Sequence, residues 1–334
     1  MADARPLLVL APNWLGDAVM ALPAIRDLKR HFADRSLIVA ARPSVASLFT
    51  MASDVAQTVK PDAAEIRVAD PSIAVLFPNS FASAWLLRRA GVHERWGYAT
   101  DMRTWMLTRA VRRSTARLHQ GEYYQHLVRE LGIATGPLEP VIEVPALAIE
   151  DARRLLGQHG WEESAPLVAL APGAAYGKAK QWIPSHVVTL VSDLADRGVT
   201  CALVGSHGDA ETTRAIRDAA PGECRTGILD LAGATTLPVL AAILSLSSAC
   251  VSNDSGAMHL AAAVGVPVVG IFGPTNDKAT SPLPRAGVPT EVVTTPVWCR
   301  PCMLRECPID HRCMTGIEPA RVRDAVDRIA RVTA

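Results

Sequence analysis

The chain has 334 residues, of which 49% are hydrophobic and 20% are charged. It is long enough for about two domains and for a large core that needs no disulfides. Lys and Arg number 34 against 33 acidic residues, so the formal net charge is +1. This balance argues against a nucleic-acid-binding protein, which is usually strongly basic.

The N-terminal residues, MADARPLLVLAPNWLGDAV, lack the pattern of a secretory signal, because their apolar run is short and no cleavage site follows. No segment offers about 18 uninterrupted apolar residues, so the sequence predicts no membrane-spanning helix. We therefore expect a cytoplasmic protein.

Two apolar runs resemble each other: LLVLAP at 7–12 and LVALAP at 167–172. Each is typical of a buried parallel strand and leads into a Gly-containing turn, a helical pattern and a second strand. The helices are expected at 17–32 and 186–198, and the second strands at 37–42 and 199–205. Strands that alternate with helices indicate βαβ units, so we predict an α/β protein with two doubly wound domains facing a central cleft.

The first strand is followed directly by NWLGDAVMALPA at 13–24. Gly16 permits a tight turn and Asp17 stands at the start of the predicted helix. Asp17 is either a simple helix cap or, because ligands bind beyond the carboxyl ends of such strands, a candidate general base.

Three prolines punctuate the segment GPLEPVIEVPALAIED at 136–151. We place the domain boundary there, with domains at 1–148 and 149–334. The last helix is expected over 319–333, with Pro319 in its first turn. One possible arrangement packs this helix back on the N-terminal domain.

The first strand of the second domain ends in PGAAYGKAKQWIP at 172–184. Small residues let backbone amides approach an anion, and Lys178 and Lys180 supply charge. The spacing is not that of a Walker A loop, and by itself the segment also fits a solvated basic loop.

A second candidate anion site lies in VSNDSGAMHL at 251–260. Asp254, Ser255 and Gly256 fall between a strand end and a helix N-terminus, where free N–H groups and the helix dipole favour an anion. His259 follows one turn later and is either a core residue or part of the same site. Asp254 is either the helix cap or a ligand of a sugar hydroxyl.

Four cysteines cluster near the C-terminus with the spacing C-x2-C-x4-C-x5-C, beside His311. They are Cys299, Cys302, Cys307 and Cys313. Thiolates and imidazole are zinc ligands and thiolates also bind iron–sulfur clusters, but the short middle gap is unusual for structural zinc sites. Reduced thiols without a metal are the simpler interpretation.

Several motifs together resemble the lipopolysaccharide core heptosyltransferases of glycosyltransferase family 9, most of all their type II members. They are NWLGDAVMALPAI, PNSFASA, PGAAYGKAKQWIP, the block at 231–276 and CRPCMLRECPIDHRCM. The resemblance implies the GT-B fold and inverting transfer of L-glycero-D-manno-heptose from ADP-heptose to the heptose/Kdo inner core of lipopolysaccharide. It implies no metal or other cofactor.

The resemblance also implies roles for individual residues. Asp17 matches the catalytic base and Lys180 the lysine that stabilises the departing ADP. Ser255 and Gly256 match the diphosphate-binding turn, with Asp254 and His259 near the donor. The remaining donor-side residues are Ala175, Gly205, Asp209, Leu231 and Gly233. Which of His207, Asp209 and Glu211 meets the ribose stays open.

The acceptor is expected on the first domain, at Gly16, Asn79, Ser80 and Arg103. Eight arginines stand against two acids between residues 88 and 117, with aromatic residues among them. This stretch is either a solvated helix face or a surface for an anionic, lipid A-linked acceptor at the inner leaflet. The second interpretation predicts peripheral association with the cytoplasmic face of the inner membrane.

Other activities remain compatible with the sequence. They are a type I or III heptosyltransferase, a family member that uses another nucleotide sugar, a sugar-nucleotide epimerase of the same fold, and a binding module stabilised by a metal at the cysteines.

Overall fold

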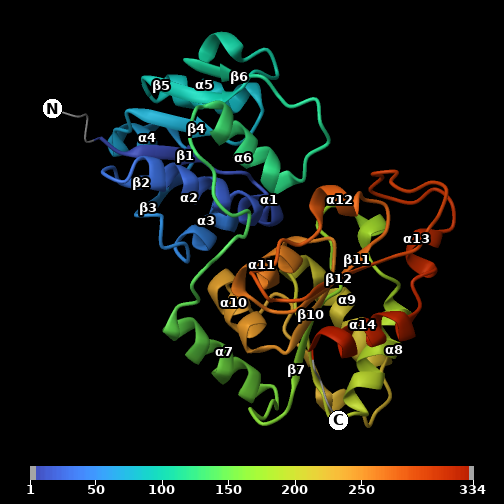
Figure 1. Ribbon diagram of the computed structural model, residues 1–334. Helices are drawn as coiled ribbons and strands as arrows, with labels where there is room; N and C mark the ends of the chain where they lie inside the picture. The colour runs from blue at the N-terminus through green and yellow to red at the C-terminus, as the bar shows by residue number, and fades with distance from the viewer. Residues whose placement is uncertain (1–4, 331–334) are drawn as a thin grey trace. The chain divides into compact units, whose positions relative to one another are not determined.

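The computed structural model describes residues 5–330 and divides into two compact units, Met1–Glu143 and Val144–Ala334 (Figure 1). The division falls within the proline-containing segment 136–151, a few residues before the boundary expected at 148–149. Each unit is built on one parallel six-stranded sheet.

The sheet of the first unit has the order β3-β2-β1-β4-β5-β6. Its strands are β1 (Leu7–Leu10), β2 (Leu37–Ala40), β3 (Gln57–Val59), β4 (Ile73–Leu76), β5 (Glu94–Tyr98) and β6 (Arg109–Val111). Its helices are α1 (Leu15–Met20), α2 (Leu22–His31), α3 (Pro43–Phe49), α4 (Ala63–Ala69), α5 (Phe81–Arg89), the 3₁₀ turn η1 (Thr104–Met106) and α6 (Gln120–Glu130).

The single helix predicted over 17–32 is wrong, because the structure has two helices, α1 and α2, that meet at Ala21. Pro23 explains the break. A proline inside a continuous helix removes an N–H donor and its ring collides with the preceding turn, whereas proline is tolerated in a first turn. Pro23 lies in the first turn of α2.

The sheet of the second unit has the order β12-β11-β10-β7-β8-β9. Its strands are β7 (Leu167–Ala171), β8 (Thr200–Leu203), β9 (Ile228–Asp230), β10 (Ala249–Asn253), β11 (Val268–Phe272) and β12 (Thr290–Thr294). Its helices are α7 (Ala146–Gln158), α8 (Pro184–Ala195), α9 (Ala210–Ala219), α10 (Leu237–Leu246), α11 (Gly256–Val264), α12 (Asp277–Thr280), α13 (Arg312–Thr315) and α14 (Pro319–Ala330), with 3₁₀ turns η2 (Lys178–Lys180), η3 (His207–Asp209) and η4 (Arg225–Gly227).

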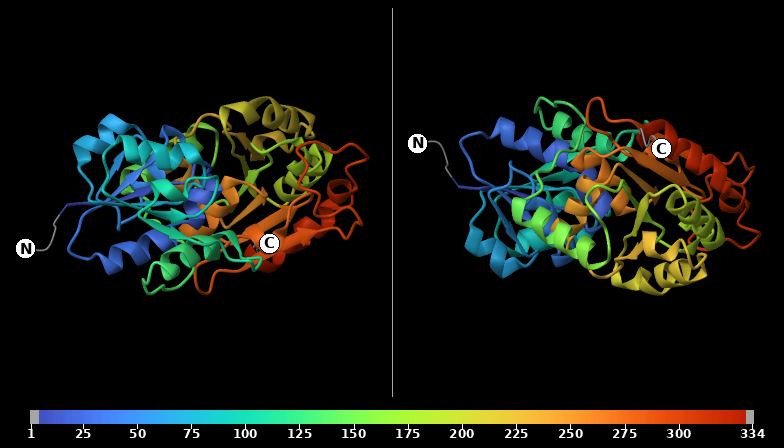
Figure 2. Two further views of the ribbon diagram at one scale, coloured as in Figure 1. Left: turned by 90° about the horizontal axis from the view of Figure 1, so that it is seen from above. Right: turned by 90° about the horizontal axis from the view of Figure 1, so that it is seen from below.

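Helices cover both faces of each sheet, as the two views of Figure 2 show. In β7, Val168 and Leu170 join a core cluster with α8, α9 and α14, whereas Leu167 and Ala171 join another with α7 and α10. Successive strand residues point to opposite faces, so a strand buried on both faces must be apolar throughout. The predicted doubly wound α/β architecture is confirmed.

The C-terminal helix α14 packs against α8 and β12 of its own unit. Its apolar face, with Val322, Ala325 and Val326, belongs to that unit's core. The apolar stripe of α14 thus completes the core of the second unit. Residues 331–333 of the predicted helix lie outside the described residues.

The strand order reverses between β1 and β4 in the first sheet and between β7 and β10 in the second. At such a reversal the loops leave to opposite sides of the sheet and open a crevice at the strands' carboxyl ends. Most of the site residues predicted from the sequence follow one of these four strands.

Candidate active site

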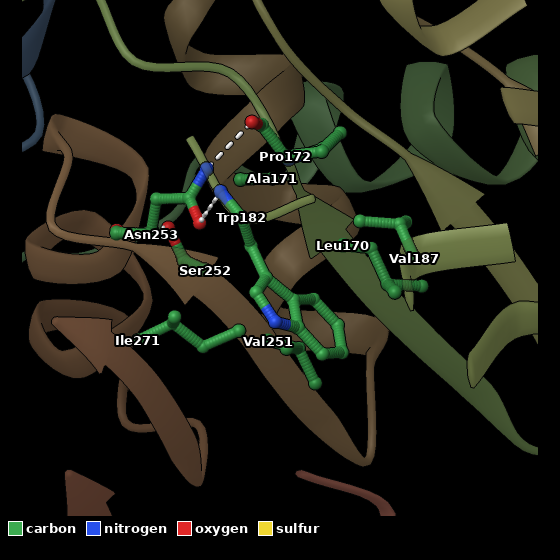
Figure 3. A pocket seen from close by; sticks show the side chains of 9 residues that line it. All are labelled: Leu170, Ala171, Pro172, Trp182, Val187, Val251, Ser252, Asn253 and Ile271. Atoms are coloured by element: carbon green, nitrogen blue, oxygen red, sulfur yellow. Dashed lines mark hydrogen bonds between the residues drawn. The ribbon is translucent and has the colours of Figure 1, made fainter. Parts of the chain in front are cut away.

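In the second unit, Asn253 connects the ends of the two strands at the reversal (Figure 3). Its Nδ2 donates to the Pro172 carbonyl at 2.5 Å, and its Oδ1 accepts from the Trp182 backbone N–H at 3.1 Å. The side chain is buried. Asn253 therefore fixes both ends of the loop 172–182, a role that no sequence pattern indicates.

The loop 172–182 carries Lys180, whose ammonium forms an ion pair with Asp254 at 2.7 Å. Asp254 is buried and Lys180 only partly exposed. The predicted alternatives for Asp254 were a helix cap and a sugar ligand. Asp254 is not the N-cap residue, which is Ser255, and the Ser255 side chain makes no cap hydrogen bond. The Asp254 carboxylate holds Lys180 beside the start of α11.

The N-terminus of α11 combines two features that attract anions. Ser255 is the N-cap residue, but its hydroxyl pairs with the Ser252 hydroxyl at 3.0 Å instead of capping the helix. The helix dipole and first-turn N–H groups therefore act together with the Lys180 ammonium. The predicted pair Ser255 and Gly256 lies at this point, while His259, one turn on, is buried.

The loop after β8 lies against the loop after β7. Asp209 accepts hydrogen bonds from the Ser206 N–H and hydroxyl at 2.8 and 2.7 Å. Its carboxylate lies so close to Gly173 that a Cβ atom there would be 2.1 Å from Oδ1, and a Cβ atom on Gly205 would also be crowded. Both glycines are thus required by the close approach of Asp209.

The predicted nucleotide-side residues divide into exposed and buried ones. Ala175 and Gly233 are exposed, and Gly233 adopts a φ of 76° beside His207. The side chain of Leu231 is 0% exposed and belongs to a core cluster, so only its backbone is left to meet a nucleotide. An apolar residue at the end of a parallel strand is equally compatible with a core position.

The cysteine-rich segment 299–313 packs on the loop that carries Lys180. The Ala179 N–H donates to the Arg305 carbonyl at 2.9 Å, and the Ala179 carbonyl lies 2.7 Å from His311 Nε2. The Tyr176 hydroxyl donates to the Met303 carbonyl at 2.9 Å. The segment therefore supports the candidate anion site from outside, a role that the cysteine spacing did not indicate.

The cysteine side chains themselves are free thiols, with Cys313 buried and Cys302 and Cys307 exposed. Burial, with a smaller contribution from the other three thiols, raises the pKa of Cys313. Among residues 5–330, no group of three or more His, Cys, Asp and Glu side chains is arranged to hold a metal ion.

In the first unit, Asp17 lies in the first turn of α1, just after β1 and the partly buried Gly16. The Tyr124 hydroxyl, from α6, donates to Asp17 Oδ1 at 3.1 Å. Burial, together with the negative charge of Asp17, raises the pKa of Tyr124 well above its usual value. Tyr124 therefore remains a neutral donor that orients the carboxylate, a contact across 107 positions that no sequence pattern indicated.

Asn79 and Ser80 follow β4, the strand next to β1. Asn79 Nδ2 donates to the Tyr123 hydroxyl at 2.9 Å, and its buried Oδ1 has no hydrogen-bond partner among residues 5–330. Ser80 is exposed and caps α5 by accepting from the Ser83 N–H at 3.3 Å. The Asn79 amide and the Asp17 carboxylate thus contact adjacent tyrosines of α6.

The assignment of Arg103 to the acceptor is wrong as a direct contact, because its side chain is 0% exposed. Its guanidinium donates to the carbonyls of Pro78 and Tyr98 at 2.5 and 3.0 Å and to the Ser83 hydroxyl at 2.8 Å. Burial lowers its pKa to about 10, which still leaves it charged at neutral pH. Arg103 fixes the loop after β4 instead of facing a ligand.

The second unit therefore presents a cation and a helix N-terminus, and the first unit a carboxylate held by a buried hydroxyl. Residues 65–312 match the model of glycosyltransferase family 9 (heptosyltransferase). The chain belongs to this family.

Characterised heptosyltransferases resemble the chain over most of its length. It is 28% identical to lipooligosaccharide heptosyltransferase 2 of Haemophilus influenzae, over 83% of this chain and 86% of that protein. It is 29% identical to lipopolysaccharide heptosyltransferase 2 of Escherichia coli, over 83% and 85%. The solved structure of E. coli ADP-heptose LPS heptosyltransferase II matches with a TM-score of 0.84 and 25% identity, over 98% of both chains.

Proposed function

We propose that this glycosyltransferase moves L-glycero-D-manno-heptose from ADP-heptose to the heptose/Kdo inner core of lipopolysaccharide, as a type II heptosyltransferase. The observation that carries the proposal is the Lys180–Asp254 ion pair beside the uncapped N-terminus of α11, in a chain of the heptosyltransferase family. Support for type II comes from the two relatives of that name.

In the proposed reaction, the acceptor hydroxyl oxygen attacks the anomeric carbon of the heptose. The bond between that carbon and the diphosphate oxygen breaks, ADP leaves, and the hydroxyl proton passes to the Asp17 carboxylate. Attack from the face opposite the leaving group inverts the anomeric centre. Tyr124 holds Asp17 in position through its 3.1 Å hydrogen bond.

Negative charge develops on the departing diphosphate. The Lys180 ammonium and the first-turn amides of α11 are preorganised donors for this charge, and such donors lower the barrier because they need no reorganisation. Ser255 and Gly256 present little steric bulk at this point, so a phosphate can reach the amides. We propose that no metal is required, because this chain's own residues supply the charge.

We place the acceptor on the first unit near Asn79 and Ser80, and the nucleotide on the loops after β8 and β9 in the second. Lipopolysaccharide precursors are anchored in the inner membrane, so we propose that the protein works at its cytoplasmic face as a peripheral protein. Within the part of the chain that the structure describes, the helices are too short or too polar to cross a membrane.

The test is ADP release from ADP-heptose in the presence of defined acceptors, with and without EDTA. We expect turnover with an acceptor that ends in Kdo-linked heptose and little with one that ends in Kdo. The reverse preference would indicate a type I enzyme. Isomerisation of ADP-heptose without any acceptor would indicate an epimerase, and loss of turnover in EDTA would contradict the proposed metal independence.

A further inference from the structure

The first unit carries a cluster of exposed apolar side chains, named here the aromatic patch. Its members are Phe81, Trp85, Met102 and Trp105, which are 40%, 43%, 86% and 59% exposed. Phe81 and Trp85 lie one turn apart on α5, and Met102 and Trp105 lie in or next to η1, which contacts α5. A contiguous group of this kind on a soluble domain marks an interaction surface.

The three aromatic rings of the patch lie near one another. The rings of Phe81 and Trp85 are stacked with centroids 6.5 Å apart, and the Phe81 and Trp105 centroids are 6.4 Å apart. The Arg88 guanidinium lies 4.9 Å from the centre of the Trp105 ring. The patch is therefore one surface that joins aromatic rings to a cation.

The backbone under the patch is fixed by side-chain hydrogen bonds from Asp101 and from the buried Arg103. The Phe81 N–H donates to the Asp101 carboxylate. The guanidinium of Arg103, which lies between Met102 and Trp105 in the chain, donates to the Pro78 and Tyr98 carbonyls and to the Ser83 hydroxyl. The rings are thus exposed because hydrogen bonds hold the backbone beneath them in place.

The chain segment that carries the patch is basic. Six exposed arginines lie within residues 88–117: Arg88, Arg89, Arg109, Arg112, Arg113 and Arg117. The acids of the same stretch are Glu94 and Asp101. Glu94 accepts a hydrogen bond from the Trp96 indole, and Asp101 accepts one from the Phe81 N–H. Both carboxylates are therefore engaged by neighbouring groups of the same stretch.

We propose that the aromatic patch docks the protein on an anionic lipid surface. Tryptophan rings prefer the boundary between lipid headgroups and acyl chains, and arginines near such a surface gain from its negative potential. The patch joins two tryptophans to Arg88 on one face, and the same chain segment carries five further exposed arginines. The inference rests on the proposed function in one respect: the lipid surface that the patch binds is the membrane that holds the acceptor.

The first test is cosedimentation of the full chain with vesicles. We expect binding to vesicles of phosphatidylethanolamine and phosphatidylglycerol, weaker binding to phosphatidylcholine alone, and a further decrease at high salt. Binding to the anionic vesicles should fall at least tenfold in the double variant W85S/W105S. The matched control is Trp298→Ser, which removes a 77% exposed tryptophan from the second unit and should bind normally.

The second test compares transfer to an acceptor embedded in the same vesicles with transfer to its deacylated, soluble form. W85S/W105S should raise KM for the embedded acceptor only, with an unchanged melting temperature. Wild-type protein that ignores anionic vesicles, or a double variant that binds them normally, would overturn the proposal.

Two further outcomes would also overturn the proposal. An equal loss with the soluble acceptor would make the patch a sugar-stacking surface, and a wild-type dimer that the substitutions dissociate would make it a self-association surface. Vesicle binding without transfer to either acceptor would leave the docking proposal standing and contradict the proposed function instead.

Discussion

The two units share one strand order but differ in the chemistry at the point where that order reverses. In the first unit, the first turn of α1 carries the Asp17 carboxylate and the loop after β4 carries the Asn79 amide, and the two groups contact adjacent tyrosines of α6. In the second, the loops after β7 and β10 carry Lys180 and the start of α11. The same scaffold thus carries a carboxylate in one unit and an ammonium beside a helix N-terminus in the other.

The units also fix these loops in a similar way, with one buried polar side chain. Arg103 in the first unit and Asn253 in the second donate to backbone carbonyls of loops that follow the strands. Buried backbone groups need partners, and a side chain can supply them where no strand is available. Arg103 and Asn253 therefore hold loops in place, whereas Asp17 and Lys180 are the residues proposed to perform the chemistry.

The largest expected effect is that of Asp17→Asn. Loss of a general base should lower kcat by about 10²–10⁴-fold. The affinity for ADP should not change, because the base lies in the unit without the anion site. Asp34→Asn, which alters an exposed acid of the same unit, is the control and should leave kcat unchanged. A normal kcat for the Asp17 variant would contradict the proposal that the first unit supplies the general base.

Next in size is Lys180→Met, which should lower kcat/KM by about 10²–10³-fold and weaken ADP binding, because the leaving group loses its fixed cation. The matched control is Lys178→Met. Lys178 is an exposed lysine of the same η2 turn and should tolerate the change. Equal losses of kcat/KM in both variants would mean that any positive charge on this loop suffices, and that the position of the Lys180 ammonium is not decisive.

Substitutions of the loop-fixing residues should act on stability. Asn253→Ala leaves the Trp182 N–H and the Pro172 carbonyl without their partner, and Arg103→Met does the same for two carbonyls. Each should lower the free energy of unfolding by about 2–3 kcal/mol, measured by urea denaturation. Arg117→Met, at an exposed position, is the control. A loss below about 0.5 kcal/mol would show that the loops are held by other contacts.

The smallest effect is expected from Tyr124→Phe. The Asp17 carboxylate loses a donor that favours its charged form, so the acid limb of the kcat/KM profile should move to higher pH. The loss of activity near pH 8 should be several-fold at most. Tyr123→Phe, next to it on α6, should leave the acid limb in place. An unshifted limb in the Tyr124 variant would contradict the positioning role.

Much of the fold could be predicted from the sequence because apolar strands alternate with amphipathic helices throughout the chain. The helix at 17–32 was predicted as one element because Pro23 follows the same apolar periodicity as its neighbours. Its missing N–H, which the periodicity does not register, ends α1 and begins α2.

The local setting of the candidate site was predictable, as the position of Ser255 and Gly256 between a strand and a helix shows. It was not predictable where contacts join distant segments. The Tyr124–Asp17 and Asn253–Trp182 hydrogen bonds span 107 and 71 positions. The burial of Arg103 could not be predicted, because nothing in a basic stretch of sequence marks one arginine as buried. In the structure, backbone carbonyls accept hydrogen bonds from its guanidinium.

The most direct test is the dissociation constant of ADP for wild-type, Asp17→Asn and Lys180→Met proteins, measured by titration calorimetry. If the second unit holds the diphosphate and the first unit the base, Asp17→Asn should bind ADP like wild type. Lys180→Met should bind at least tenfold more weakly. Weaker binding by Asp17→Asn, or normal binding by Lys180→Met, would contradict this division of roles.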